Sequence, residues 1–367
     1  MGDLLTFIND YLVTFLFILT VAVFFHELGH YAVARWNGVR VDVFSIGFGP
    51  ELFGWNDKAG TRWKVSAIPL GGYIRMFGEG MEEGSEEPRD LTEEEKKVSF
   101  HHKRLGQRAA VVAAGPIANL ILAIVVFFGV YSVAGIQQVL PVVADVVEGS
   151  PAEAAGLQSG DKILSISGEP IQYFTDLARY VGDRPRQAVV FEVARQDQVI
   201  SIDAVLGTRE NAATGSTQGF IGIHSDPTAF EVQDVGILEA ASMSVEQTAL
   251  AGSAMLGGLM NIIFGAADPS ELGGPIRIAQ ISGEVAKGGI VPVLHFLAFL
   301  SINLFLINLF PIPVLDGGHL LFYAIEGVRG RPLGPTAQEY GFRFGLVLVF
   351  ALMIFATFND LVMVFSG

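Results

Sequence analysis

The sequence predicts a polytopic α-helical membrane protein of about four transmembrane helices, with a β-hairpin region and one inserted α+β domain. Charged residues make up only 17% of the 367-residue chain, against about 25% in an average soluble domain. Four apolar stretches approach or exceed the roughly 20 residues that a helix needs to cross hydrocarbon. Between them lie segments that mix β-branched and aromatic residues with Gly and Pro breaks, a pattern typical of strands.

The first predicted transmembrane helix occupies residues 1–36, and HELGH at positions 26–30 interrupts its apolar run. A signal peptide is rejected, because residues 1–10 carry no positive charge and no small-residue cleavage site follows. An ionisable group is costly in lipid, so HELGH is a functional hypothesis by default.

Residues 37–104 are predicted to form a cytoplasmic and re-entrant β region with an acidic loop. Hairpins are expected at Val41–Phe53 and Thr61–Met76, and a solvated, flexible segment at Glu79–Glu95. Such strands can dip to membrane depth where protein or water covers them. The alternative is a small cytoplasmic sheet, and periodicity alone leaves both possibilities open.

The second transmembrane helix is predicted at residues 105–136, and the charges on either side of it set the orientation. Arg35–Arg108 holds 12 Lys and Arg, whereas Gln137–Lys287 holds only 8 over about twice the length. The positive-inside bias therefore places the first loop in the cytoplasm and the second outside.

Residues 137–232 are predicted to form a compact domain. Pro141–Ile171 has the pattern strand, short Ala-rich helix, turn, strand; a helix at Tyr173–Val181 and strands at Ala188–Ala194 and Val199–Val205 follow. Through SPAEAAGLQSGDKILSISGEPI the segment resembles a PDZ domain, a module that binds extended peptides at a sheet edge. It lacks the GLGF-type loop that binds a C-terminal carboxylate, so capture of a C-terminus is not predicted. The domain either binds peptide in another way or only fills space and blocks access to the membrane region.

The remaining chain completes the membrane region. Residues 233–289 are predicted to form an interfacial amphipathic helix and linker, with a fifth span as the competing interpretation. A third transmembrane segment, containing NLFPIPVLDGG, is expected at residues 290–324, and a loop with a fourth transmembrane helix at residues 325–367.

The spacing within HELGH predicts a metal site. Positions i and i+4 share one helix face, so His26 and His30 can bind one metal while Glu27 points towards its open side. Imidazoles favour zinc, and catalytic zinc needs a third protein ligand. Asp316 is the preferred candidate, because Pro311 and Pro313 break the helix before it. His319 is the rival ligand.

Two features of the composition exclude other functions. Cysteine is absent, so disulfides and thiolate metal sites are impossible. The net charge of −15 argues against nucleic-acid binding, which needs a basic surface.

HELGH together with NLFPIPVLDGG resembles the site-2 protease family of intramembrane zinc metalloproteases. GFGP at 47–50, AAGPIAN at 113–119 and GGPIRIAQ at 273–280 are similar to its bacterial regulator-of-sigma-E protease branch. The resemblance implies that His26, His30 and Asp316 bind one zinc ion, that Glu27 is the general base, and that Asn308 hydrogen-bonds the substrate backbone. It also implies a re-entrant hairpin at GFGP and a substrate-pairing edge strand made of Gly71, Gly72, Tyr73, Ile74, Arg75 and Met76.

The function implied is regulated intramembrane proteolysis. We expect a multi-pass protein of the bacterial inner membrane, with its PDZ-like domain on the periplasmic side, that cuts pre-trimmed single-pass proteins such as anti-sigma factors or remnant signal peptides. Its contacts would be those substrates and membrane lipid. One departure is that the family's well-known members carry two tandem PDZ domains, whereas this chain has room for one. The alternative function is a catalytically inactive, membrane-anchored PDZ scaffold that binds partner tails.

Overall fold

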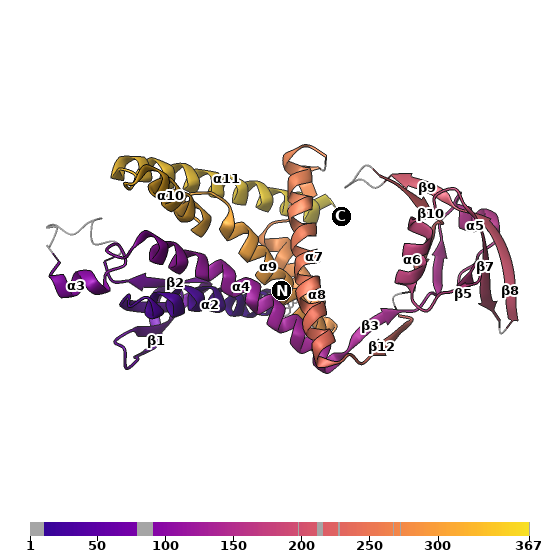
Figure 1. Ribbon diagram of the computed structural model, residues 1–367, viewed down its shortest axis with the longest axis horizontal. Coiled ribbons are helices and arrows are strands. Elements are labelled where there is room, and N and C mark those ends of the chain that lie inside the picture. Colours follow the sequence, from indigo (N-terminus) through magenta and orange to yellow (C-terminus); the bar gives the residue numbers. More distant parts are fainter. Residues whose placement is uncertain are drawn as a thin grey trace. The chain divides into compact units, whose positions relative to one another are not determined.

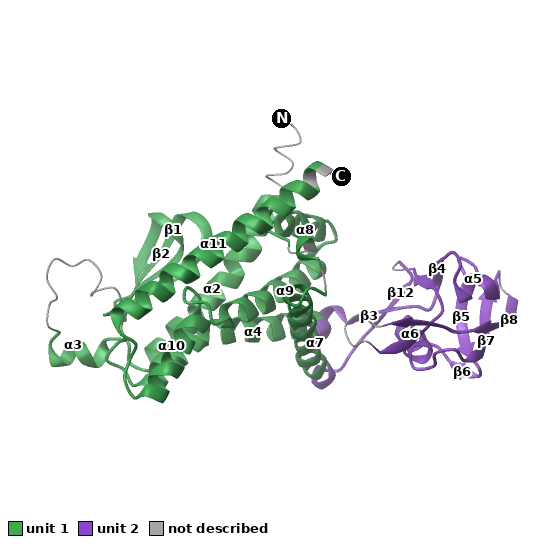
Figure 2. Cartoon of the chain, turned by 90° about the horizontal axis from the view of Figure 1, so that it is seen from above, with its two compact units in different colours: residues 1–130, 241–367 green, residues 131–240 purple. Residues whose placement is uncertain are grey.

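The structure is a computed structural model that describes residues 11–78, 91–196, 198–210, 216–226, 228–266, 268–271 and 273–366. It divides into two compact units (Figure 2). Unit 1 comprises Met1–Val130 and Ala241–Gly367, and unit 2, Tyr131–Ala240, is inserted between these two parts of the sequence. Most of the predicted acidic loop, residues 79–90, lies outside the described residues.

Four helices in the described part of unit 1 are long and apolar enough to cross a membrane (Figure 1). They are α2 (Val13–Trp36), α4 (Leu105–Ala134), α9 (Ile290–Leu309) and α11 (Pro335–Ser366). These helices confirm the predicted number of transmembrane helices.

Strands β1 (Val41–Asn56) and β2 (Arg62–Met76) form an antiparallel sheet beside α2. Both strands bend, so that residues 43–46 of β1 pair with residues 62–65 on one side and with residues 72–75 on the other. Residues 53–56 then pair with residues 62–65, which makes four segments from two strands. The predicted hairpins are confirmed as strands, and their re-entrant placement stays a prediction.

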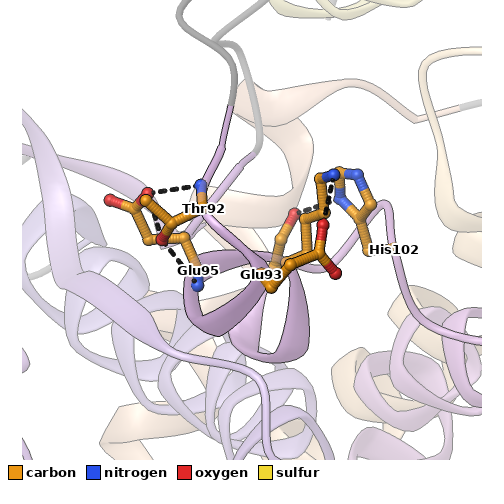
Figure 3. A network of polar contacts seen from close by, with 6 residues as sticks. Thr92, Glu93, Glu95 and His102 are labelled. Atoms are coloured by element: carbon orange, nitrogen blue, oxygen red, sulfur yellow. Dashed lines mark hydrogen bonds and ion pairs between the residues drawn. The ribbon is translucent and has the colours of Figure 1, made fainter.

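Short helix α3 (Glu93–Val98) precedes α4 and begins with a capping box. The side chain of Glu95 reaches back to Thr92, whose hydroxyl accepts a hydrogen bond from the Glu95 backbone (Figure 3). Beside it, His102 contacts the hydroxyl of Ser99 at 3.1 Å.

Three more helices and a short 3-10 turn complete the described part of unit 1: α7 (Ile237–Ile263), η2 (Pro269–Glu271), α8 (Pro275–Lys287) and α10 (Asp316–Arg329). Helix α8 has no side-chain cap of its own. Instead, the buried Asp360 of α11 accepts hydrogen bonds from the backbone N–H groups of Gly274, Ile276 and Arg277 at 2.8–3.1 Å. The interfacial position of residues 233–289 stays a prediction.

Unit 2 contains the strand and helix order predicted for residues 137–232. Its four-stranded sheet has the order β6 (Glu169–Pro170), β5 (Lys162–Ile166), β7 (Ala188–Arg195), β8 (Gln198–Val205), and two short helices accompany it. Buried Ile163, Phe191 and Leu177 lie in its hydrophobic core. The elements are β3 (Ile136–Val139), β4 (Val143–Val146), α5 (Pro151–Ala155), β5 (Lys162–Ile166), β6 (Glu169–Pro170), α6 (Phe174–Gly182), β7 (Ala188–Arg195), β8 (Gln198–Val205), β9 (Gly207–Glu210), β10 (Thr217–Phe220), β11 (Ile223–Ser225) and β12 (Phe230–Gln233).

Candidate active site

Helix α2 carries HELGH and presents it on two faces. His26 and His30 are four residues apart and point the same way, with Nε2 atoms 3.2 Å apart. Phe24, Glu27 and Tyr31 follow the alternative spacing of three and four, and both aromatic rings contact Phe44 of β1. Glu27 therefore lies on the face of α2 that packs against the sheet, next to the histidine face.

Asp316 is the first residue of α10, and a break in the helical path brings it to the histidines. Helix α9 ends at Leu309, so the predicted segment 290–324 is two helices joined by residues 310–315. The prolines at 311 and 313 lack the N–H that a continuing helix needs. Gly317 permits the tight return, because a Cβ there would lie 2.3 Å from the carbonyl oxygen of Leu309.

Helix α10 is also fixed to α4. Arg108 donates to Glu326 at 2.5 Å, and both side chains are largely buried. The Arg108 guanidinium also lies 4.9 Å from the centre of the Tyr323 ring. This pair holds the helix that begins with Asp316 against the helix that packs on α2.

Three ligand atoms converge where α2 meets α10. Asp316 Oδ2 lies 3.2 Å from His26 Nε2 and 3.5 Å from His30 Nε2. This Asp316 Oδ2 atom is buried and makes no hydrogen bond within the described residues. Three facing lone pairs repel one another unless a cation or a shared proton lies between them. Ligand atoms at 2.0–2.2 Å from a tetrahedral zinc ion are about 3.3–3.6 Å apart, so the residues present fit zinc.

Helix α4 packs against both histidines and makes contacts with their rings that were not predicted from the sequence. His30 Nδ1 lies 2.9 Å from the carbonyl oxygen of Val111, which can only accept, so Nδ1 carries a proton and, in the neutral ring, Nε2 keeps its lone pair. Gly115 leaves room for the ring, because a Cβ there would lie 2.2 Å from His30 Nε2. Asn119 is fully buried beside His26; it ends the AAGPIAN motif and is a polar side chain in an apolar helix, but no role was assigned to it from the sequence.

The predicted edge strand lies directly against HELGH. A Cβ on Gly72 would come within 3.2 Å of Glu27 Cγ, and the backbone amide of Ile74 interacts with the Glu27 carboxylate. Residues 72–76 pair with β1 along one side, and no described strand pairs with their other side. Met76 is different from the rest, because its side chain is buried in a core cluster with Ala34 and Val111.

The other two candidate residues have separate positions. Asn308 is half-buried in the last turn of α9, eight residues before Asp316. His319, the rival ligand, is outside the group of converging ligand atoms in the described part of the chain. Its ring instead packs at 5.3 Å from the ring of Phe342 on α11.

Comparison with known families decides the class of this enzyme. The family model described as peptidase family M50 matches residues 14–352. The chain belongs to peptidase family M50. It is a membrane-embedded zinc metalloprotease, a hydrolase acting on peptide bonds, and the predicted site-2 protease resemblance is confirmed.

Several curated proteins are similar to this M50 chain over almost its whole length. Two have names that begin "Putative zinc metalloprotease": one from Rhizobium meliloti, 46% identical over 95% of both chains, and one from Agrobacterium fabrum, 43% identical over 97% of this chain and 96% of its own. A third, "Metalloprotease MmpA" from Caulobacter vibrioides, is 37% identical over 95% of both. The enzyme interpretation is therefore preferred over the inactive scaffold.

Solved PDZ domains are similar to part of the chain. The PDZ domain of the SdrC-like protein from Listeria monocytogenes is 22% identical, with a TM-score of 0.20, over 23% of this chain and 84% of its own. The corresponding domain from Listeria innocua is 21% identical, with the same TM-score, over 27% and 99%. The term PDZ-like therefore depends on the order of strands and helices along unit 2.

Proposed function

We propose that this M50 enzyme hydrolyses a peptide bond inside the transmembrane segment of single-pass membrane proteins. The observation that carries the proposal is the location of the convergent His26, His30 and Asp316 atoms. Two of these residues lie within α2, a helix that is long and apolar enough to span a membrane. Ionisable groups are costly in lipid, so those found within a transmembrane helix usually have a function at membrane depth.

The residues of α2 and α10 have distinct roles in this proposal. His26, His30 and Asp316 hold one zinc ion, which when bound lowers the pKa of a water molecule towards 7 and polarises a carbonyl. Glu27 is adjacent to the ligand face and accepts the proton of the attacking water as general base. It then donates that proton to the leaving amine.

Strand residues 72–76 present the substrate to Glu27. No described strand pairs with the outer side of residues 72–75, so an extended chain can hydrogen-bond there as an added strand. A transmembrane helix must unwind first, because its carbonyl groups are occupied in helical hydrogen bonds. Asn308, at the end of α9, supplies a further hydrogen bond to the substrate backbone.

Substrates and location follow from the same proposal. Anti-sigma factors and remnant signal peptides are single-pass segments of the required kind. The excess of Lys and Arg in the loop before α4 supports a cytoplasmic position for that loop. The proposal accordingly assigns the PDZ-like domain to the periplasmic side of a bacterial inner membrane. The β1–β2 region would then be re-entrant from the cytoplasmic side.

Cleavage of tagged model peptides in lipid tests this proposal. Two peptides share polar ends and differ in one Gly-Pro pair at the centre of the apolar segment. We expect cuts within that segment, located by mass spectrometry, and faster cutting of the Gly-Pro peptide because its helix unwinds more easily. Chelation should abolish both reactions and added zinc restore them. Cuts confined to the polar ends would contradict the proposal.

A further inference from the structure

Asn119 is an unusual residue in the middle of α4. It is the only polar side chain in the run Val111–Val130 and is fully buried. Its Nδ2 atom lies 3.4 Å from Nδ1 of His26, and its Oδ1 atom is buried with no hydrogen-bond partner in the described part of the chain. An unpaired amide oxygen is costly at membrane depth, so this carboxamide needs an explanation.

The tautomer of His26 that metal binding requires supplies that explanation. Nε2 of His26 faces Asp316 Oδ2 and His30 Nε2, so binding of a metal there requires a lone pair on Nε2 and a proton on Nδ1. That N–H then points at the Asn119 carboxamide, where it needs an acceptor. A half-turn of the carboxamide exchanges its nitrogen and oxygen without changing its volume. The turn gives His26 Nδ1–H an acceptor and gives the unpaired Oδ1 a donor.

We propose that Asn119 is a positioning residue whose Oδ1 accepts a hydrogen bond from His26 Nδ1–H and holds the ring with Nε2 towards Asp316. Val111 O makes the equivalent contact to His30. Helix α4 thus orients both histidines, one through a backbone carbonyl and the other through a side chain. The inference rests on the ligand role of His26 in the proposed function.

A role in packing alone makes the opposite prediction for two substitutions. Leu has the branching and the number of side-chain heavy atoms of Asn but no acceptor, so a packing role is affected less by Asn119→Leu than by the buried charge of Asn119→Asp. A hydrogen-bond role reverses the order, since a carboxylate is a common acceptor for the second nitrogen of a zinc-bound histidine. Asn119→Ala provides a second variant without an acceptor in case the Leu chain does not insert.

Zinc affinity measured by chelator competition on purified full-length protein tests the inference independently of catalysis. We expect Asn119→Leu and Asn119→Ala to lose about 10- to 100-fold in zinc affinity, the usual effect of removing such a partner, and Asn119→Asp to bind as wild type. Ser301→Ala is the matched control, because it removes a buried hydroxyl that bonds within its own helix to Leu297; it should bind zinc normally.

The outcomes separate the two proposals. Wild-type affinity in the variants without an acceptor, or an equal loss in these variants and in Asn119→Asp, would overturn the role of Asn119. His26→Ala tests the proposed set of zinc ligands, on which the role of Asn119 depends. This variant should lose nearly all bound zinc. If His26→Ala binds zinc as wild type does, the proposed ligand set itself is wrong.

Discussion

Side chains from three helices make the site, and each type of contact has a separate cause. His26 and His30 share a face because they are four residues apart, and Asp316 reaches them because α10 begins with it. Val111 and Asn119 of α4 then contact the far nitrogens of the two rings. Helix packing and these polar contacts thus hold three atoms that could bind a metal close together.

The choice between Asp316 and His319 as third ligand can be tested by substitution. We expect Asp316→Ala to reduce bound zinc strongly together with activity, because it removes a ligand atom 3.2 Å from His26 Nε2. His319→Ala should keep most of its zinc, since that ring packs on Phe342. Zinc content is measured by atomic absorption on purified protein. Equal zinc in wild type and Asp316→Ala would show that another carboxylate is the ligand.

Sequence spacing could predict the histidine pair, because it depends only on local helix geometry. It could also point to Asp316, because prolines mark the helix break. Asn119 ends the AAGPIAN motif, but its role was missed, since its contact with His26 joins residues 93 positions apart. The Val111 carbonyl could not have been found at all, because every residue has one.

Among the elements, the close approach of α2 to α4 positions the site most directly. A Cβ on Gly29 would lie 2.3 Å from the carbonyl oxygen of Ala114, and Gly115 lies directly against His30. Small residues at such crossings are typical of membrane helix pairs. The cap of α8 by Asp360 is a second long-range contact, across 86 residues, and for that reason local sequence patterns gave no sign of it.

In unit 2 the turn before β5 is fixed by a buried ion pair. Asp161 is fully buried and accepts two hydrogen bonds from Arg195 at 2.7 Å, at the end of β7, and one from the backbone N–H of Gln158. Burial opposes the charged form, but these hydrogen bonds outweigh it and hold the pKa of the Asp161 carboxyl below its ordinary value. The motif that resembles PDZ domains therefore contains a structural carboxylate.

Substitution of this carboxylate should loosen unit 2 in a pH-dependent way. A lowered folded-state pKa stabilises above the unfolded pKa of about 3.9 and loses that effect as pH falls through the folded value. Asp161→Asn should cost about 2 kcal/mol near pH 7, and the difference from wild type should shrink below pH 4. Hydrogen exchange of β5 and β7 in the full chain measures it.

An exposed aspartate on β8, Asp203, provides the matched control. Asp203→Asn should leave exchange at wild-type rates throughout, because a solvated carboxylate contributes little. Unchanged protection in Asp161→Asn at pH 7 would contradict the assigned role of the ion pair.

The whole molecule combines a membrane unit with an inserted unit on short connections. One residue, Gly135, separates α4 from β3, and residues 234–236 separate β12 from α7. Strand pairing brings Val139 opposite Phe230, so both ends of the insertion are adjacent. The order of strands and helices along the sequence of this unit was predictable, because the alternation of apolar and polar residues in a strand is a local pattern. The four-segment pairing of β1 and β2 was not, because it depends on where each strand bends.

Excision of the insertion tests whether it selects substrates by size. Replacing residues 140–229 with Asn-Gly should leave β3 and β12 closed as a hairpin, since their register already opposes Val139 and Phe230. If the domain excludes bulky substrates, the shortened enzyme should cut untrimmed single-pass proteins that wild type rejects. Cleavage of trimmed and untrimmed substrate is compared in the same membranes by gel analysis.

A peptide-binding role for the PDZ-like domain predicts the reverse pattern. The shortened enzyme would cut the trimmed substrate more slowly and still reject the untrimmed form. That result from a folded, zinc-loaded protein would rule out selection by size.

The central claim is that Glu27 acts as general base beside a zinc ion held by its neighbours on α2. The most direct measurement compares wild type with Glu27→Gln, reading zinc content and the rate of cleavage of a transmembrane peptide on the same preparation. Gln has nearly the same shape but cannot accept the proton, so we expect full zinc and a rate lower by about 10²-fold or more. Full zinc with a near-normal rate in Glu27→Gln would contradict the claim.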